Sequence, residues 1–105
     1  MLATRKIQNY NVVMTIRFEW DPKKAASNEK KHGVSFEEAR TVFFDENAKL
    51  IDDPDHSDDE DRFVLLGISS MLRVMVVCHC YREQGNLIRI ISARKASAHE
   101  SRQYR

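Results

Sequence analysis

The chain has 105 residues, of which 42% are hydrophobic and 31% are charged. This length and balance fit one globular domain and exclude an intrinsically disordered chain. No apolar run reaches the roughly 20 residues that span a bilayer, and polar residues interrupt the N-terminus where a signal peptide is apolar. We therefore expect a cytoplasmic protein that does not enter a membrane.

Charge is unevenly distributed along the chain, although the formal net charge is only +1. Residues 1–44 hold eight basic and five acidic side chains, residues 45–61 hold one and nine, and residues 62–105 hold eight and two. The three blocks therefore carry +3, −8 and +6. Acidic and basic blocks this distinct indicate a surface that faces a polyanion and a separate acidic region.

The first residues show no clean hydrophobic period. We therefore expect an N-terminal extension over residues 1–13 and a single folded domain over residues 14–105. Apolar residues then alternate with polar ones, which predicts a first strand with Ile16, Phe18 and Trp20 on one face.

Capping residues predict two helices after this strand. Asp21 followed by Pro22 suits a helix N-terminus, because Asp is a good cap and Pro fits the first helical position. This helix runs to about His32 and is ended by Gly33.

The second helix starts with the S-x-x-E capping box formed by Ser35 and Glu38. Apolar residues such as Phe36 and Ala39 recur at helical spacing, so this helix lays an apolar stripe on the core. We expect it to end near Asp45.

The remainder is predicted to be mostly strands. They cover residues 48–51, 62–69, 72–83 and 87–93, with an acidic loop at 52–61 and a turn at 84–86. A further capping box, Ser97 with Glu100, starts a short helix that ends at Tyr104. The predicted fold class is α+β, in the order β-α-α-β-β-β-β-α, with helices packed on an antiparallel sheet.

No metal site is predicted. Cys78 and Cys80 point to one face of their strand and are read as small buried hydrophobes, whereas His79 between them points the other way. The acidic loop lacks the Gly and Glu that a calcium-binding EF-hand loop requires. No cofactor is expected either.

A set of residues spread over the domain resembles the BrnT toxin family. The matching residues are Phe18, Glu19, Trp20, Asp21, Lys24, Asn28, Lys31, His32, Gly33, Val34, Ser35, Phe36, Glu38, Ala39, Val42, Phe43, Glu60, Arg62, Gly67, the run 88–94, Glu100 and Tyr104. They cover about residues 15–105, and the order and spacing of the whole set carry the resemblance.

The resemblance implies a RelE-like fold and the toxin role in a type II toxin–antitoxin module. Such a toxin is a ribonuclease that cleaves RNA and inhibits translation and growth. The resemblance also implies a cognate antitoxin, usually a ribbon-helix-helix DNA-binding protein, with operator DNA bound only through the complex.

Metal-independent RNA cleavage needs a base, an acid and cations that stabilise the extra charge on the phosphate. Arg94 is the first candidate, chiefly because of the family resemblance. It ends the last strand and alternates with Ile88, Ile90 and Ser92. Arg62, which opens an earlier strand, is the second. Both could instead be surface arginines paired with acidic residues.

Two histidines are the candidate acid and base, because histidine titrates near neutral pH. His79 lies in the middle of a strand, and its alternative is a buried histidine with satisfied hydrogen bonds. His32 belongs to the Lys-His-Gly sequence shared with the family, and its alternative is a cation that ends a helix.

The basic C-terminal block supplies candidate RNA contacts. They are Arg82, Arg89, Lys95, Arg102 and Tyr104. The cations could equally be solvated surface charges, and Tyr104 could pin the last helix to the sheet. The alternative to an enzyme is a non-catalytic RNA- or protein-binding module with the same fold.

Overall fold

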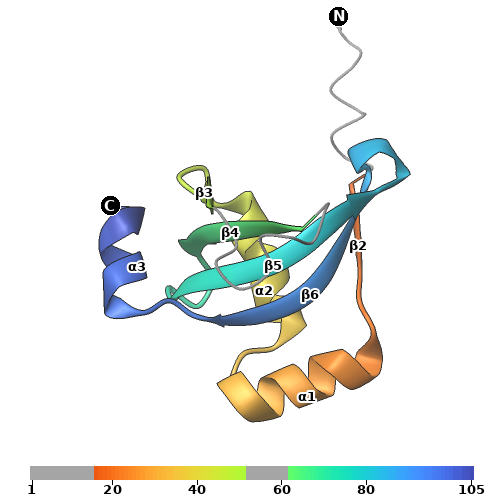
Figure 1. Cartoon of the computed structure of the whole chain (residues 1–105), viewed down its shortest axis with the longest axis horizontal. Coiled ribbons are helices and arrows are strands. Elements are labelled where there is room, and N and C mark those ends of the chain that lie inside the picture. The colour runs from red at the N-terminus through yellow and green to blue at the C-terminus, as the bar shows by residue number, and fades with distance from the viewer. Residues whose placement is uncertain (1–15, 52–61) are drawn as a thin grey trace, which may run out of the picture.

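The structure, a computed structural model, describes residues 16–51 and 62–105. The predicted N-terminal extension and the acidic loop at 52–61 therefore lie outside the described residues. The elements in chain order are β2 (Arg17–Glu19), α1 (Pro22–His32), α2 (Phe36–Thr41), the 3-10 turn η2 (Val42–Phe44), β3 (Lys49–Ile51), β4 (Phe63–Ile68), β5 (Val74–Arg82), the 3-10 turn η3 (Glu83–Gly85), β6 (Leu87–Lys95) and α3 (Ala98–Tyr104) (Figure 1). No helix among them is long and apolar enough to cross a membrane.

The five strands form one sheet in the order β2-β6-β5-β4-β3 (Figure 1). The strands from β3 to β6 pair antiparallel, as predicted, but β2 pairs parallel with β6. The expectation of a purely antiparallel sheet is therefore wrong for the first strand. Its apolar alternation specifies which face is buried, and that pattern is the same for either strand direction.

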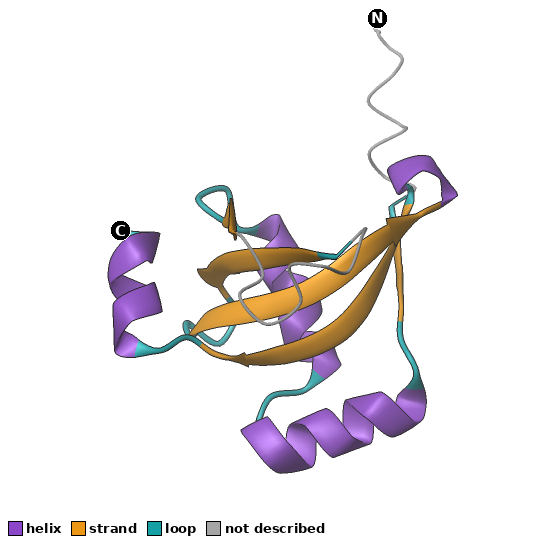
Figure 2. Ribbon diagram, viewed as in Figure 1, coloured by secondary structure: helices purple, strands orange, loops and turns teal. Residues whose placement is uncertain are grey.

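Helices cover the two faces of the sheet unequally (Figure 2). The helix-covered face carries α1, α2 and η2, and its core side chains are Val34, Phe36, Ala39, Val42, Leu65, Met75, Val77, Ile90 and Ala93. On the opposite face a smaller cluster of Val64, Leu66 and Val76 packs against Tyr104 of α3. The α+β class is thus confirmed, with a mixed sheet.

The helix ends follow the capping residues. Asp21 caps α1, Gly33 ends it in the left-handed conformation at φ 70°, and Ser35 caps α2. The second helix ends near Asp45, as predicted, but its last turn tightens, because α2 ends at Thr41 and the 3-10 turn η2 continues to Phe44. Asp45 turns away there to accept hydrogen bonds from the backbone N–H of Ile68 and other groups outside the helix.

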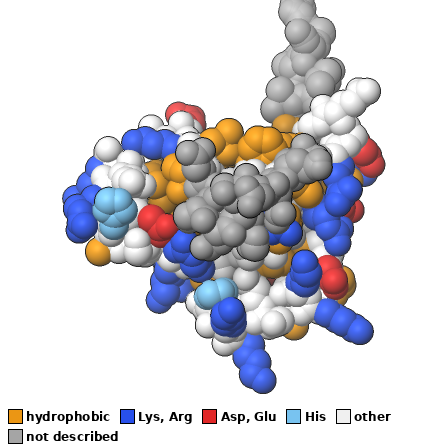
Figure 3. Space-filling view, in the orientation of Figure 1, with side chains coloured by type: hydrophobic (Ala, Val, Ile, Leu, Met, Phe, Trp, Pro, Cys, Tyr) orange, Lys and Arg blue, Asp and Glu red, His pale blue; other side chains and the backbone are white. Residues whose placement is uncertain are grey.

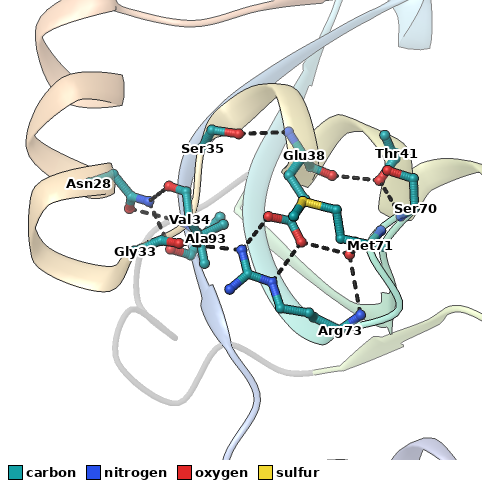
Figure 4. Close-up of polar contacts among 11 residues, drawn as sticks. Asn28, Gly33, Val34, Ser35, Glu38, Thr41, Ser70, Met71, Arg73 and Ala93 are labelled. Carbon is teal, nitrogen blue, oxygen red and sulfur yellow. Dashed lines mark hydrogen bonds and ion pairs between the residues drawn. The ribbon is translucent and has the colours of Figure 1, made fainter.

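A buried amide joins α1 to the sheet (Figure 4). Asn28 Nδ2 donates to the carbonyl oxygens of Val34 at 3.1 Å and Ala93 at 2.8 Å. Asn28 Oδ1 accepts from the Ala93 N–H at 3.1 Å. Asn28 is only 8% exposed, so these hydrogen bonds take the place of water for the buried amide and for the backbone groups of Val34 and Ala93.

A buried ion pair joins α2 to the β4–β5 turn (Figure 4). Glu38 accepts from Arg73 Nε at 2.9 Å, from a second Arg73 nitrogen, and from the Ser69 hydroxyl at 2.7 Å. Arg73 also donates to the Gly33 carbonyl at 3.3 Å. Hydrogen bonding from Arg73 outweighs burial and lowers the pKa of Glu38, so the carboxylate is charged at neutral pH.

Replacing the buried amide tests its role in stability. Asn28→Ala should lower the free energy of unfolding by about 2–3 kcal/mol, because it leaves the Ala93 amide and two carbonyls without partners. Ser27→Ala, on the exposed side of α1, should change it by less than about 0.5 kcal/mol. Urea unfolding of the three proteins measures both values, and equal effects of the two substitutions would contradict the prediction.

Candidate RNA-binding face

A β-bulge in β6 decides which side chains share a face. Cys78 pairs with Ser92, but the next residue, His79, pairs with Ile90, so Ile91 has no opposite residue. The expectation that Arg94 shares a face with Ser92 is therefore confirmed, whereas the expectation that it shares this face with Ile88 and Ile90 is wrong. Ser92 and Arg94 point away from the helix-covered face, whereas Ile90 is 2% exposed and lies in its core.

The bulge brings three arginines to the face opposite α1 and α2. Cross-strand pairing places Arg82 and Arg89 on the same side as Arg94, with Cys80 and Ser92 among them. We call this set the arginine face. In Figure 1 α2 passes behind the sheet, and Figure 3, in the same orientation, shows Lys and Arg side chains around the margin of the near side.

Arg94 is held by a two-pronged ion pair. Its two terminal nitrogens donate to the two carboxylate oxygens of Glu100, at 2.8 and 2.9 Å. Glu100 also completes the predicted capping box of α3, accepting from the Ser97 N–H at 2.9 Å. Hydrogen bonds from Arg94, helped by Ser97, lower the pKa of Glu100 to about 2. Glu100 is therefore a fixed anion that positions Arg94, not a proton donor near neutral pH.

Arg82 and Arg89 share one carboxylate on β2. Arg89 lies 2.9 Å and Arg82 3.6 Å from the same oxygen of Glu19. The side chain of Arg89 is 34% exposed and that of Arg82 is 55% exposed. Two guanidinium groups against one carboxylate leave a net positive charge at this end of the arginine face.

The other expected RNA contacts are divided between the two sides of the sheet, with Tyr104 and α3 on the side that carries Arg94. Lys95 ends β6 and pairs with Met75, so it belongs to the helix-covered side. Arg102 is exposed on α3. Tyr104 packs against the smaller core cluster, and its hydroxyl donates to Asp45 at 2.6 Å, which pins α3 to the sheet. Arg62 is half-buried immediately before β4.

His79 is buried on the helix-covered face, away from Arg94. Its Nδ1 donates to the Val77 carbonyl at 3.2 Å, and its Nε2 accepts from the Tyr81 hydroxyl at 3.1 Å. The ring lies against Phe43 and Phe63, with centroids 4.8 and 6.1 Å away. Burial lowers the pKa of His79, so the ring is neutral at physiological pH.

The expected catalytic set is not brought to one place. His32 is half-buried at the end of α1, beside the helix-ending Gly33, and His79 is inside the core. Neither joins Arg94 on the arginine face. In residues 16–51 and 62–105, no group of three His, Cys, Asp or Glu side chains has the arrangement of a metal site, and Cys78 and Cys80 are not joined by a disulfide.

Sequence reasoning missed Glu19 as the shared partner of two arginines, and it did not place Arg89 beside Ser92 and Arg94. The parallel pairing of Glu19 with Arg89 makes the first contact. A signal for the second was present, since the adjacent Ile90 and Ile91 break the two-residue alternation of an exposed strand.

The comparisons with known proteins identify the family. Residues 20–100 match the family model described as ribonuclease toxin, BrnT, of type II toxin–antitoxin system. The chain belongs to the BrnT family. The resemblance drawn from the sequence is thereby confirmed, and membership of a type II system implies an antitoxin partner for this BrnT-family toxin.

One solved structure supports the fold of this BrnT-family toxin. The 1.1 Å crystal structure of the Brucella abortus ribonuclease toxin, BrnT, matches with a TM-score of 0.61 and 24% sequence identity. The match covers 78% of this chain and 97% of that chain. No curated protein matches the chain. The RelE-like order of elements stays a prediction.

The Arg94–Glu100 pair should make stability depend on pH. The pKa of Glu100 is about 2 in the folded chain against 4.5 for a free side chain, so its stabilising effect is present above about pH 4.5 and is lost as pH falls toward about 2. We expect Glu100→Gln to be less stable than wild type at neutral pH, with a difference that shrinks below about pH 4.5. Urea unfolding from about pH 7 to about pH 3 measures it, and a constant difference would contradict the assignment.

Proposed function

We propose that this BrnT-family toxin is a metal-independent endoribonuclease that cleaves RNA in the cytoplasm and thereby inhibits translation and growth. The match of residues 20–100 to a family of ribonuclease toxins carries the proposal. The proposed partner is a cognate antitoxin with a ribbon-helix-helix DNA-binding domain, and operator DNA is bound only through the complex.

The position of Arg94 supports a role in stabilising the transition state. When the ribose 2′-hydroxyl attacks the phosphate, extra negative charge develops on the phosphate oxygens. A guanidinium is always charged and offers several N–H donors in a plane that matches phosphate oxygens. Glu100 holds the Arg94 guanidinium in one orientation, and a donor that is already oriented needs no reorganisation during the reaction. We assign Arg62 the same kind of role.

Arg82 and Arg89 are proposed to bind RNA phosphates next to Arg94. Their pairing with a single Glu19 holds them in place and leaves net positive charge for a polyanion. Lys95, Arg102 and Tyr104 are proposed as further contacts beyond this group.

The base and the acid are proposed to come from His32 and His79. His32 is the more accessible ring, whereas His79 is 0% exposed on the helix-covered face, so its action on the same phosphate as Arg94 requires the chain to rearrange. The pH dependence of the cleavage rate of His32→Gln and His79→Gln tests which of the two histidines is the base or the acid. Removing a catalytic histidine should abolish the rise or the fall of the rate that its titration causes.

Removing Arg94 tests the nuclease. We expect purified wild-type chain to cut single-stranded RNA in EDTA, and Arg94→Ala to cut it about 100-fold more slowly. The matched control is Lys30→Ala, an exposed cation on α1 that should cleave at the wild-type rate. Circular dichroism checks that each variant is folded.

Two results would contradict this proposal. RNA that stays full-length at enzyme excess would exclude the nuclease, and RNA bound without cleavage would instead support a non-catalytic binding module. The burial of His79 on the face opposite Arg94 is the observation that favours the second candidate, since it separates a candidate acid or base from the arginine face.

Growth and copurification test the toxin role. Inducing the gene alone should arrest growth, and inducing it together with the adjacent antitoxin gene should restore growth and yield a stable complex on affinity purification. Unaffected growth, together with a toxin that purifies alone from the intact operon, would contradict it.

A further inference from the structure

The outer edge of β2 is an unpaired sheet edge in the described part of the chain. β2 is the last strand of the sheet on that side, with β6 as its only neighbour among residues 16–51 and 62–105 (Figure 1). The Arg17 N–H donates to the Asn86 carbonyl on the β6 side at 2.9 Å. In a strand the N–H and the carbonyl of one residue point to the same side and those of the next residue to the other side, so the Phe18 N–H and carbonyl point outward. This edge offers a donor and an acceptor to another backbone.

A hollow of about 660 Å³ lies along the same strand. All five residues from Ile16 to Trp20 line it, together with Arg40, Glu83 and Leu87. Side chains from both faces of β2 contribute, which places the hollow beside the strand and not over one face. Ile16 is 42% exposed, so the lining includes apolar surface that a partner would bury.

The charge of the hollow is not fully balanced. Glu83 pairs with Arg17, and Glu19 pairs with Arg82 and Arg89. Arg40 is exposed and lies over the Phe18 ring, 5.8 Å from its centroid. No ion pair in residues 16–51 and 62–105 involves Arg40. An acidic side chain on the occupant would complete this site.

We propose that the outer edge of β2 binds an extended segment of the antitoxin as an added strand, with apolar side chains in the hollow and a carboxylate on Arg40. An added strand uses both backbone groups of Phe18 and buries the apolar lining of the hollow, whereas an RNA phosphate has no donor for the Phe18 carbonyl. The inference rests on the antitoxin partner of the proposed function. The antitoxin would then bind at β2, the strand that also carries Glu19.

Amide exchange tests the backbone contact directly. In the isolated ¹⁵N-labelled toxin, the Phe18 amide should exchange with solvent faster than the Arg17 amide, which is bonded to Asn86. In the complex with the product of the adjacent antitoxin gene, Phe18 exchange should slow by about tenfold or more. Unchanged Phe18 exchange in a stable complex would overturn the inference. So would a Phe18 amide that is already protected in the isolated toxin, because this chain or a second copy would then occupy the edge.

A charge reversal tests the predicted carboxylate. Arg40→Glu should weaken antitoxin binding about tenfold or more in calorimetry, by placing like charges together. The matched control is Lys23→Glu, the same charge change at an exposed position of α1 outside the hollow, which should bind as wild type does. Equal affinity of the Arg40→Glu and wild-type toxins would overturn the proposed contact.

The two proposals fail in different ways. A chain that neither cleaves RNA nor arrests growth contradicts the proposed function. A neutralised toxin whose Phe18 amide stays unprotected contradicts only the β2 docking surface. A chain that forms no complex with the adjacent gene product overturns the docking surface and the proposed antitoxin partner, but not the proposed nuclease activity.

Discussion

The buried amide of Asn28 fixes the point at which the first helix meets the last strand. Two of its hydrogen bonds go to the backbone of Ala93, whose side chain is in the main core, so the rotation of β6 about its axis is set at this residue. The next residue, Arg94, must then point to the other side of the sheet. β6 pairs with both β2 and β5, so the same contact also governs where the edge strand and the arginine face lie. An apolar side chain at position 28 could pack but could not specify this orientation.

Three carboxylates hold four arginines of the described residues in place, and two of these carboxylates, Glu38 and Glu19, join elements far apart in the sequence. Glu38 joins α2 to Arg73 in the β4–β5 turn, Glu19 joins β2 to β5 and β6, and Glu100 joins α3 to β6. Depressed pKa values of Glu38 and Glu100 show that these carboxylates stay ionised when buried or half-buried. The near-neutral net charge therefore hides cations whose positions are fixed by anions, which is what binding a flexible polyanion at a defined site requires.

Local signals in the sequence predict the local structure well. Asp21, Gly33, Ser35 and Ser97 mark helix ends because each acts through its own backbone neighbourhood. The existence of the strands follows from short apolar runs for the same reason. The direction of β2 could not be predicted, since it depends on where two helices return the chain relative to β6.

The candidate site was predicted only in part. The sequence indicates Arg82, Arg89 and Arg94 one by one. Their common face depends on the bulge, and the pairing of two of them depends on Glu19, and neither feature follows from the alternation of side chains along one strand. His79 was selected for its chemistry, and its burial depends on rings from η2 and β4 that lie distant in the sequence.

The bulge at Ile91 lets β6 hold one residue more than its pairing with β5 requires. If this residue were deleted, Ile90 opposite His79 and Ser92 opposite Cys78 would follow one another on both strands, so Arg89, Ala93 and Arg94 would keep their present faces. The strand would lose only the local kink and the extra twist that a bulge adds. A one-residue gap at this point of an alignment is therefore compatible with the same arginine face.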